Sequence, residues 1–166
     1  MADRIVLIDS GRLVQCDTPQ EIYQEPVTSF VAGFIGTMNF VRGWRVLGRG
    51  MLKLGDIELE VHNGKLARFQ EHSVTIAIRP EDIRVLEEKQ QGQNILTIPV
   101  NKVEFRGASY RLYLGMPGGG NGDEPQMFEV DMQAAKLERL GIGKDHDVTI
   151  HLPPERILFF AQESEA

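Results

Sequence analysis

The sequence has few of the features that mark secreted, membrane-spanning or nucleic-acid-binding proteins. Cys16 is the single cysteine among 166 residues, which excludes an internal disulfide and favours a reducing compartment. No apolar run approaches the roughly 20 residues that span a bilayer, and the run at residues 5–8 is too short for a signal peptide. The net charge is −6. We therefore expect no direct membrane insertion and no nucleic-acid partner, because nonspecific binding of nucleic acid needs a cationic face.

Groups that could carry chemistry are also sparse and scattered. The Gly-rich run 118–122 lacks the Gly-Lys-Ser/Thr that would complete a phosphate-binding loop. No nucleophile, base and orienting group stand together in any segment. We expect no catalytic, cofactor-binding or metal-binding residue in this chain. The histidines have no metal-ligand spacing to another His, Cys or carboxylate; they are His62, His72, His146 and His151.

The first 36 residues differ in composition from the rest. Residues 5–8 form a run of apolar β-formers, typical of a strand buried on both faces, and a short strand returns from residue 13. Thr18 and Glu21, with Pro19 between them, predict a helix that starts with a capping box. A second short helix is expected after Thr28 or Ser29. A hairpin and two short helices cannot bury their apolar faces alone, so this segment is interpreted as the last piece of a larger α/β domain.

The second short helix carries one apolar stripe. Its residues recur at helical spacing, and they are a candidate packing or interface surface. We predict that this stripe packs on the following domain or pairs with a second copy of the chain. Its members are Phe30, Val31, Phe34 and Ile35.

From residue 38 onward the pattern predicts β-structure. About ten short strands with Gly and Pro corners favour a barrel-like β domain. The apolar phase shifts near Asn101-Lys102, which predicts a bulge that curls the sheet. One or two helical turns are expected over Ala134–Leu140. The polar segment 87–94 leaves open whether the β region is one body or two subdomains.

One corner lies in the middle of this β region. Val74, Ile76 and Ile78 alternate with less apolar residues, as in a strand with one face in a core. Pro80 then interrupts the strand. Two interpretations of the flanking charges stay open: a structural corner, or a contact to a partner domain or a small anion. The candidate residues are Arg79, Pro80 and Glu81.

Residues 2–36 closely resemble the end of the nucleotide-binding domain in ABC importer ATPases. The resemblance lies in Ala-Asp-Arg-Ile at 2–5, Thr-Pro-Gln-Glu-Ile-Tyr at 18–23 and Phe-Val-Ala-Gly-Phe-Ile-Gly at 30–36. The remainder resembles the regulatory TOBE domain of those ATPases, through the Arg-Pro-Glu corner at 79–81 and Val-Glu-Phe-Arg-Gly at 103–107.

The resemblance implies a mainly β, OB-like barrel, single or doubled, preceded by a β-hairpin and two short helices. It divides the chain into a nucleotide-binding-domain remnant (1–36), a TOBE domain (37–161) and a tail (162–166). The ATP-site motifs of the family have no counterpart in this sequence. The fragment is therefore expected not to be an enzyme and to bind no cofactor. The full-length parent is expected to bind ATP and Mg.

The family also implies a role and a setting. The role is regulation and dimerisation of an importer's ATP-binding subunit as a homodimer, at the cytoplasmic side of the membrane. Permease subunits would be contacted through the ATPase body. Residues 37–40 resemble the subgroup that imports polyamines, ferric iron or phosphonates. The alternative function is a small-ligand or oxyanion sensor of TOBE type.

Overall fold

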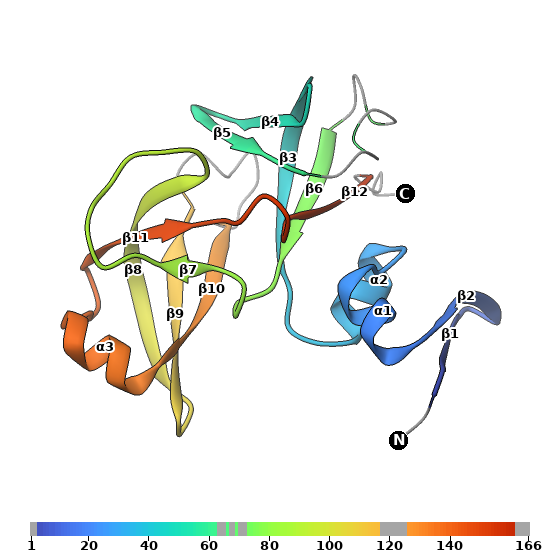
Figure 1. Ribbon diagram of the computed structural model, residues 1–166, viewed down its shortest axis with the longest axis horizontal. Helices are drawn as coiled ribbons and strands as arrows, with labels where there is room; N and C mark the ends of the chain where they lie inside the picture. The colour runs from blue at the N-terminus through green and yellow to red at the C-terminus, as the bar shows by residue number, and fades with distance from the viewer. Residues whose placement is uncertain (1–2, 63–65, 67–68, 70–72, 117–125, 162–166) are drawn as a thin grey trace. The chain divides into compact units, whose positions relative to one another are not determined.

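The computed structural model describes residues 3–62, 66, 69, 73–116 and 126–161. The chain forms two compact units, Met1–Met38 and Asn39–Ala166 (Figure 1). We call them the N-terminal unit and the β unit. The expected tail at 162–166 lies outside the described residues.

The N-terminal unit is a β-hairpin followed by two short helices. Its core consists of Leu7, Ile22 and Val31, with Ile5, Val14 and Ile35 packed at its margin. The elements are β1 (Ile5–Asp9), β2 (Arg12–Asp17), α1 (Pro19–Gln24) and α2 (Ser29–Phe34).

Local capping chemistry starts both helices, as predicted. The Thr18 hydroxyl accepts a hydrogen bond from the Glu21 N–H (3.3 Å), and the Glu21 carboxylate accepts one from the Thr18 N–H (3.0 Å). Pro19 occupies the first turn, where its missing N–H costs nothing. Thr28 is the cap of α2, since its hydroxyl accepts from the Val31 N–H (3.2 Å). These contacts confirm the helix starts expected from the sequence.

The prediction that residues 5–8 are buried on both faces is wrong. Leu7 is buried, but Val6 and Ile8 are 55% and 62% exposed. The physical reason is that the hairpin has only two strands, and α1 and α2 can cover only one of its faces. Apolar residues on both faces therefore leave one apolar face open.

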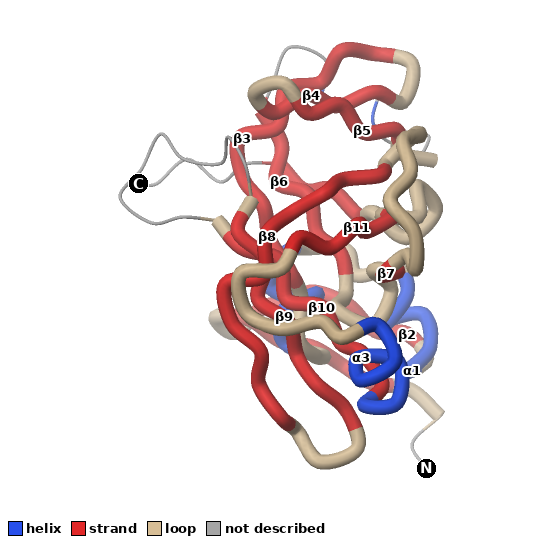
Figure 2. The backbone as a smooth tube through the Cα atoms, turned by 90° about the vertical axis from the view of Figure 1, so that its left-hand side faces the viewer, coloured by secondary structure: helices blue, strands red, loops and turns tan. Residues whose placement is uncertain are grey.

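The β unit contains two five-stranded antiparallel sheets and one helix (Figures 1 and 2). We call the sheet with strand order β10-β9-β8-β11-β7 the barrel sheet, and the sheet with order β12-β6-β3-β4-β5 the second sheet. The elements are β3 (Asn39–Gly48), β4 (Met51–Leu54), β5 (Ile57–Glu60), β6 (Ser73–Ile78), β7 (Arg84–Val85), β8 (Ile95–Phe105), β9 (Ser109–Gly115), β10 (Met127–Gln133), α3 (Ala134–Leu140), β11 (Asp147–His151) and β12 (Leu158–Ala161).

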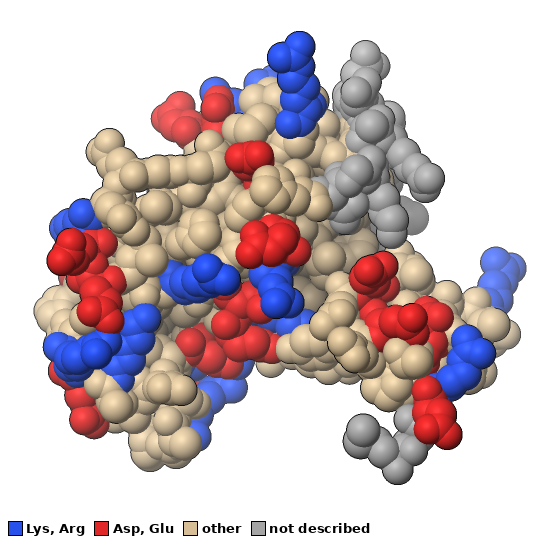
Figure 3. All heavy atoms as spheres, in the orientation of Figure 1, with Lys and Arg blue, Asp and Glu red and all other residues tan. Residues whose placement is uncertain are grey.

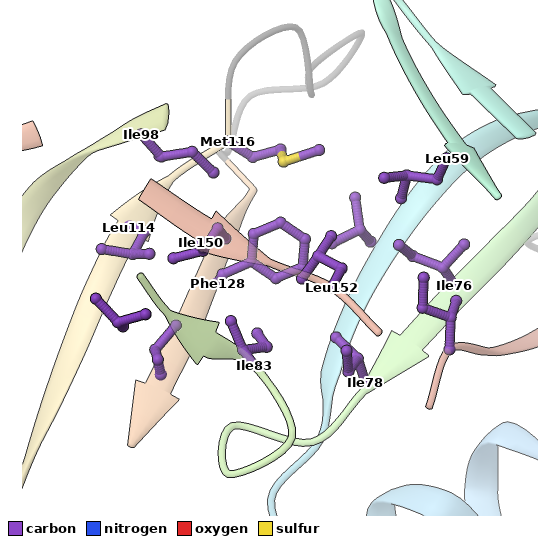
Figure 4. Packing of buried hydrophobic residues seen from close by; sticks show 14 of the residues in the cluster. Leu59, Ile76, Ile78, Ile83, Ile98, Leu114, Met116, Phe128, Ile150 and Leu152 are labelled. Carbon is purple, nitrogen blue, oxygen red and sulfur yellow. The ribbon is translucent and has the colours of Figure 1, made fainter. Parts of the chain in front are cut away.

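Both sheets of the β unit cover the same hydrophobic core. Figure 4 shows Leu59 and Ile76 from the second sheet and Phe128 and Ile150 from the barrel sheet directed into one cluster. Phe128 and Trp44 are among the largest side chains that are fully buried. The mainly β fold expected from the sequence is confirmed. The polar segment 87–94 does not separate two cores, because the cluster includes residues on both sides of it.

Strand β6 is buried on both faces, which corrects the expectation of one buried face. Thr75, Ala77 and Arg79 are 8%, 0% and 4% exposed. The in-sheet neighbours β3 and β12 pair only with the edges of β6, so the burial of both faces means that chain packs on the sheet from both sides. Alternation in the sequence could not report that coverage.

A bulge in β8 bends the barrel sheet. The register between β8 and β9 shifts between Val100 and Lys102, so Asn101 is the extra residue. The N-terminal part of β8 pairs with β11 and the C-terminal part with β9. This confirms the bend predicted near Asn101-Lys102. Helix α3 spans the predicted residues and ends at Gly141, whose φ of 60° is the left-handed conformation that favours glycine.

Candidate functional site

The Arg-Pro-Glu corner forms a tight turn between β6 and β7. The Arg79 C=O accepts a hydrogen bond from the Asp82 N–H (3.0 Å), and the Pro80 C=O accepts one from the Asp131 N–H (3.1 Å). Arg79 is 4% exposed, whereas Glu81 is exposed to solvent. The second bond ties the corner to β10, the far edge of the barrel sheet. The corner therefore brings the two edges of that sheet together.

A partly buried carboxylate lies inside this corner. Burial raises the pKa of Asp82, and the Arg156 guanidinium, whose Nε lies 3.8 Å from the carboxylate, opposes the shift. Glu81 also raises the pKa, while Arg79 and Arg84 lower it. Three cations around one carboxylate agree with a corner that is held by charge pairing.

Two side-chain amides join the two sheets of the β unit. The Asn39 amide donates to the Glu129 C=O (2.8 Å) and accepts from the Glu129 N–H (2.6 Å). The Gln126 amide accepts from the Arg42 N–H (2.6 Å) and donates to the Arg42 C=O (3.4 Å). Each amide imitates the backbone of a neighbouring strand. Together they satisfy backbone groups at the free edge of β10 and at the bulge of β3.

A third amide, in the polar segment 87–94, also bonds backbone groups of two different parts of the β unit. Asn94 is 2% exposed. Its side chain accepts from the Glu60 N–H (2.7 Å) and donates to the C=O groups of Glu60 (2.7 Å) and Leu152 (2.9 Å). Sequence reasoning missed all three amides, because an isolated Asn or Gln in a sequence is more often a turn or surface residue.

A buried arginine orders the outer face of the barrel sheet. Arg111 is 7% exposed and binds the Asp131 carboxylate through two bonds (2.7 and 2.8 Å) and the Glu129 carboxylate through a third (2.5 Å). Hydrogen bonding to Asp131 raises the pKa of Arg111 above its ordinary range. Arg111 and Asp131 are direct partners across β9 and β10, so the register of the sheet sets this pair.

Glu104 is the centre of a second, more exposed charge cluster on the same sheet. It accepts hydrogen bonds from Lys102 (2.8 Å), Arg106 (3.0 Å) and the Tyr113 hydroxyl (3.1 Å). The Lys102 hydrogen bond is the largest cause that lowers the pKa of Glu104 to about 2, followed by those of Tyr113 and Arg106. Figure 3 shows basic and acidic side chains interspersed over the visible face.

The predicted apolar stripe of α2 divides into two parts. Val31 is buried in the core of the N-terminal unit and Ile35 packs against that core. Phe30 and Phe34 point away from it, at 43% and 66% exposure, and their rings stack with centroids 6.0 Å apart. The rings of Phe30 and Phe34, which we call the Phe30–Phe34 pair, form an exposed apolar surface.

Within the described ranges, no group of three or more His, Cys, Asp or Glu side chains is placed to hold a metal ion. His72 and the Gly-rich run 118–122 lie outside those ranges. In the part of the chain that the structure describes, no helix has both the length and the apolar character to cross a membrane.

Comparison with protein families identifies the β unit. The family model described as "TOBE domain" matches residues 76–160, which include the Arg-Pro-Glu corner and all strands of the barrel sheet. The chain belongs to the TOBE domain family. Its family membership thus rests on the segment that forms the corner and the shared core.

Curated relatives place the whole chain in a wider group. It is 31% identical to the oligosaccharides import ATP-binding protein MsmX of Bacillus subtilis, over 99% of this chain and 44% of the relative. It is 38% identical to the sulfate/thiosulfate import ATP-binding protein CysA 2 of Chromobacterium violaceum, over 99% of the chain and 43% of the relative. It is 33% identical to the spermidine/putrescine import ATP-binding protein PotA of Borreliella afzelii, over 95% and 40%.

These relatives establish the protein group to which the aligned region belongs, but not the subgroup. The chain spans 40 to 44% of the length of the relatives named above, so the aligned region is a part of ABC importer ATP-binding proteins that contains the TOBE domain. Their names cover oligosaccharides, sulfate/thiosulfate and spermidine/putrescine. The subgroup indicated by residues 37–40 is therefore not resolved.

One solved structure has the same fold. It is the cytoplasmic molybdate-binding protein ModG with molybdate bound, with a TM-score of 0.54, 13% identity, and coverage of 76% of this chain and 96% of ModG. At this identity the likeness establishes the fold and nothing about ligands.

Proposed function

We propose that this chain is the regulatory and dimerisation region of the ATP-binding subunit of an ABC importer. The observation that carries the proposal is the alignment of nearly all of the chain with importer ATP-binding proteins that are more than twice as long. In this proposal the parent subunit binds ATP and Mg through its missing body. That body contacts the permease subunits at the cytoplasmic side of the membrane.

The exposed apolar face of the hairpin supports this parentage. Val6, Ile8 and Leu13 are 55%, 62% and 65% exposed, which is unusual for a strand pair in a complete domain. As the end of a nucleotide-binding domain, with domain limits at 1–36 and 37–161, the hairpin would be covered by the remainder of that domain.

The genomic sequence upstream of the codon for Met1 tests the parentage. We expect an in-frame segment that encodes a Gly-Lys-Ser/Thr phosphate-binding loop. A stop codon directly upstream, with no such segment elsewhere in the operon, would contradict the proposal. Equilibrium dialysis of the chain with ATP and Mg is the companion measurement, and we expect no binding because the family's ATP-site residues have no counterpart in the sequence.

Dimerisation is tested by sedimentation velocity of the chain over a wide concentration range. We expect a concentration-dependent homodimer. The Phe30–Phe34 pair is the proposed contact of the N-terminal unit, since two stacked exposed rings favour burial. Replacing both phenylalanines with serine should weaken the dimer. Replacing the exposed Leu47 of the β unit with serine is the control and should leave the dimer unchanged. A strict monomer at every concentration would remove the dimerisation half of the proposal.

A second candidate function is a small-ligand or oxyanion sensor. The specific observation that favours it is the fold shared with ModG, a protein described as molybdate-binding. Titration calorimetry with molybdate, sulfate, a phosphonate and spermidine tests it. Heat of binding with one oxyanion would support the sensor, and heat with spermidine or a phosphonate would support the subgroup indicated by residues 37–40. The absence of heat with all four ligands would remove this candidate.

A further inference from the structure

The barrel sheet does not close completely, and its open side forms a groove. The groove lies between the edge strands β7 and β10, is open to solvent, and has a volume of about 490 Å³. We call it the seam groove. It is lined by residues 83–87 and 131–133 and by Lys136.

One wall of the seam groove presents strand backbone from β7. The Leu86 N–H donates to the Thr149 C=O of β11 (2.8 Å). Backbone groups alternate in direction along a strand, so the N–H and C=O of Val85 point away from β11 and into the groove. The Val85 C=O accepts a hydrogen bond from the Lys136 Nζ (2.7 Å), which shows that this edge is open to a side-chain donor.

The opposite wall presents strand backbone from β10. The bond from the Met116 N–H to the Gln126 C=O sets the alternation, so the backbone groups of odd-numbered residues face away from β9. The groups of Glu129 are held by the Asn39 amide, and the Asp131 N–H is held by Pro80. Beyond that point, no strand of the described chain pairs with this edge of β10.

The acidic side chains of the seam groove are already neutralised. Glu87 forms an ion pair with Arg139, and Asp131 forms one with the buried Arg111. Both carboxylates are therefore paired with cations that do not line the groove.

The basic side chains of the seam groove are not neutralised in this way. Among the described residues, neither Arg84 nor Lys136 forms an ion pair with a carboxylate. The charge of Arg84 lowers the pKa of Asp82 without such a contact. In a chain of net charge −6, the groove thus carries two cations without a carboxylate partner, of which Lys136 donates to the Val85 C=O. Its floor is apolar, with Ile83, Val85 and Met132 buried.

We propose that the seam groove binds an extended acidic segment of a partner protein, which adds a strand between β7 and β10. The partner backbone pairs with the Val85 N–H and with the open groups of β10 beyond Asp131, and it takes the place of the Lys136 ammonium at the Val85 C=O. Alternate side chains, which point to opposite sides of a strand, place carboxylates near Arg84 and Lys136 and apolar groups on the floor. This role is independent of the ATPase parentage, so its failure leaves the proposed function untouched.

The test is binding of fluorescein-labelled pentapeptides to the whole chain, followed by fluorescence anisotropy. The probe alternates glutamate and valine. The comparison peptides replace glutamate with lysine, or carry N-methyl groups on alternate backbone nitrogens to block strand pairing. We expect binding of the first peptide only. Arg84→Gln and Lys136→Met should each weaken it by about fivefold at low salt, whereas the exposed Lys144→Met is the matched control and should leave it unchanged.

Amide NMR shifts then locate the bound peptide and distinguish it from a simple anion. We expect shifts at residues 84–87 and 131–136. Succinate, a free dicarboxylate, should compete only at concentrations far above the peptide's dissociation constant. The proposal is overturned if the shifts lie elsewhere, if the N-methylated peptide binds equally well, if succinate competes as strongly as the peptide, or if no peptide binds at millimolar concentration.

Discussion

The two units of this chain differ most in how much of their apolar surface they bury. The β unit covers one large core from two sheets, whereas the N-terminal unit has a core of three buried side chains. Of the ten exposed large apolar residues among those described, seven lie in the N-terminal unit: Val6, Ile8, Leu13, Tyr23, Val27, Phe30 and Phe34.

This difference separates two sources of stability. Burial of apolar area stabilises the β unit, since each fully buried large side chain contributes roughly 1.5–3 kcal/mol. The N-terminal unit depends more on local hydrogen bonds, such as the capping box of Thr18 and Glu21. A unit of that kind is expected to need a covering partner, in agreement with the proposed ATPase body.

The largest expected effect is a cavity in the core of the β unit. Phe128 is fully buried and Phe34 is 66% exposed, so the same substitution can be made in both environments. Phe128→Ala should lower the free energy of unfolding by about 3–5 kcal/mol, and Phe34→Ala by less than about 0.5 kcal/mol. Urea unfolding followed by far-UV circular dichroism measures both. Equal effects of the two changes would contradict the contrast between the units.

Removing one amide bridge should have the next largest effect. Asn94→Ala leaves the N–H and C=O of Glu60 and the C=O of Leu152 without their side-chain partner. We expect a loss of about 2–3 kcal/mol, because buried polar groups then remain unpaired. The same urea titration measures it, and the exposed Gln91→Ala in the same segment is the control. A neutral Asn94→Ala variant would mean that this amide bridge adds nothing to the stability of the β unit.

The capping box at Thr18 tests how far local hydrogen bonds stabilise the N-terminal unit. Thr18→Ala removes the acceptor of the Glu21 N–H and should destabilise α1 by about 1 kcal/mol. Hydrogen exchange of the α1 amides should then accelerate by about fivefold, with no change in the β unit. Thr18→Ser retains the hydroxyl and should exchange like the parent. Unchanged exchange in the alanine variant would show that packing, and not the cap, holds this helix.

The smallest effect is a pH-dependent contribution from Glu104. Its pKa is lowered from the ordinary 4.5 to about 2, so the folded state binds its proton less readily than the unfolded state. The contribution to stability is therefore present above pH 4.5 and is lost as the pH falls toward 2. Thermal unfolding should show Glu104→Gln less stable than the parent at pH 7, and this difference should vanish near pH 2. Glu88→Gln, an exposed change, should show no such trend, and a difference that persists at pH 2 would contradict the assignment.

Much of the local structure could be predicted from the sequence. The capping box at Thr18 and the helix end at Gly141 depend on residues that are neighbours in the chain. The bulge at Asn101 appears in the sequence as a shift of the apolar pattern along one strand. The barrel-like β class also followed from the alternation and the corners. The candidate site was harder to predict from the sequence. The pattern indicated the Arg-Pro-Glu corner, but not the hydrogen bond from the Asp131 N–H to the Pro80 C=O.

The sequence by itself thus determined much of the local structure, because caps and turns are set by contacts a few residues apart and a bulge appears as a shift of the apolar pattern along one strand. Only the tertiary structure decided that both faces of β6 are buried, that Asn39, Gln126 and Asn94 join two sheets, and that β7 and β10 leave a groove. These features depend on which strands become neighbours. The pattern along one strand carries no record of what covers its second face.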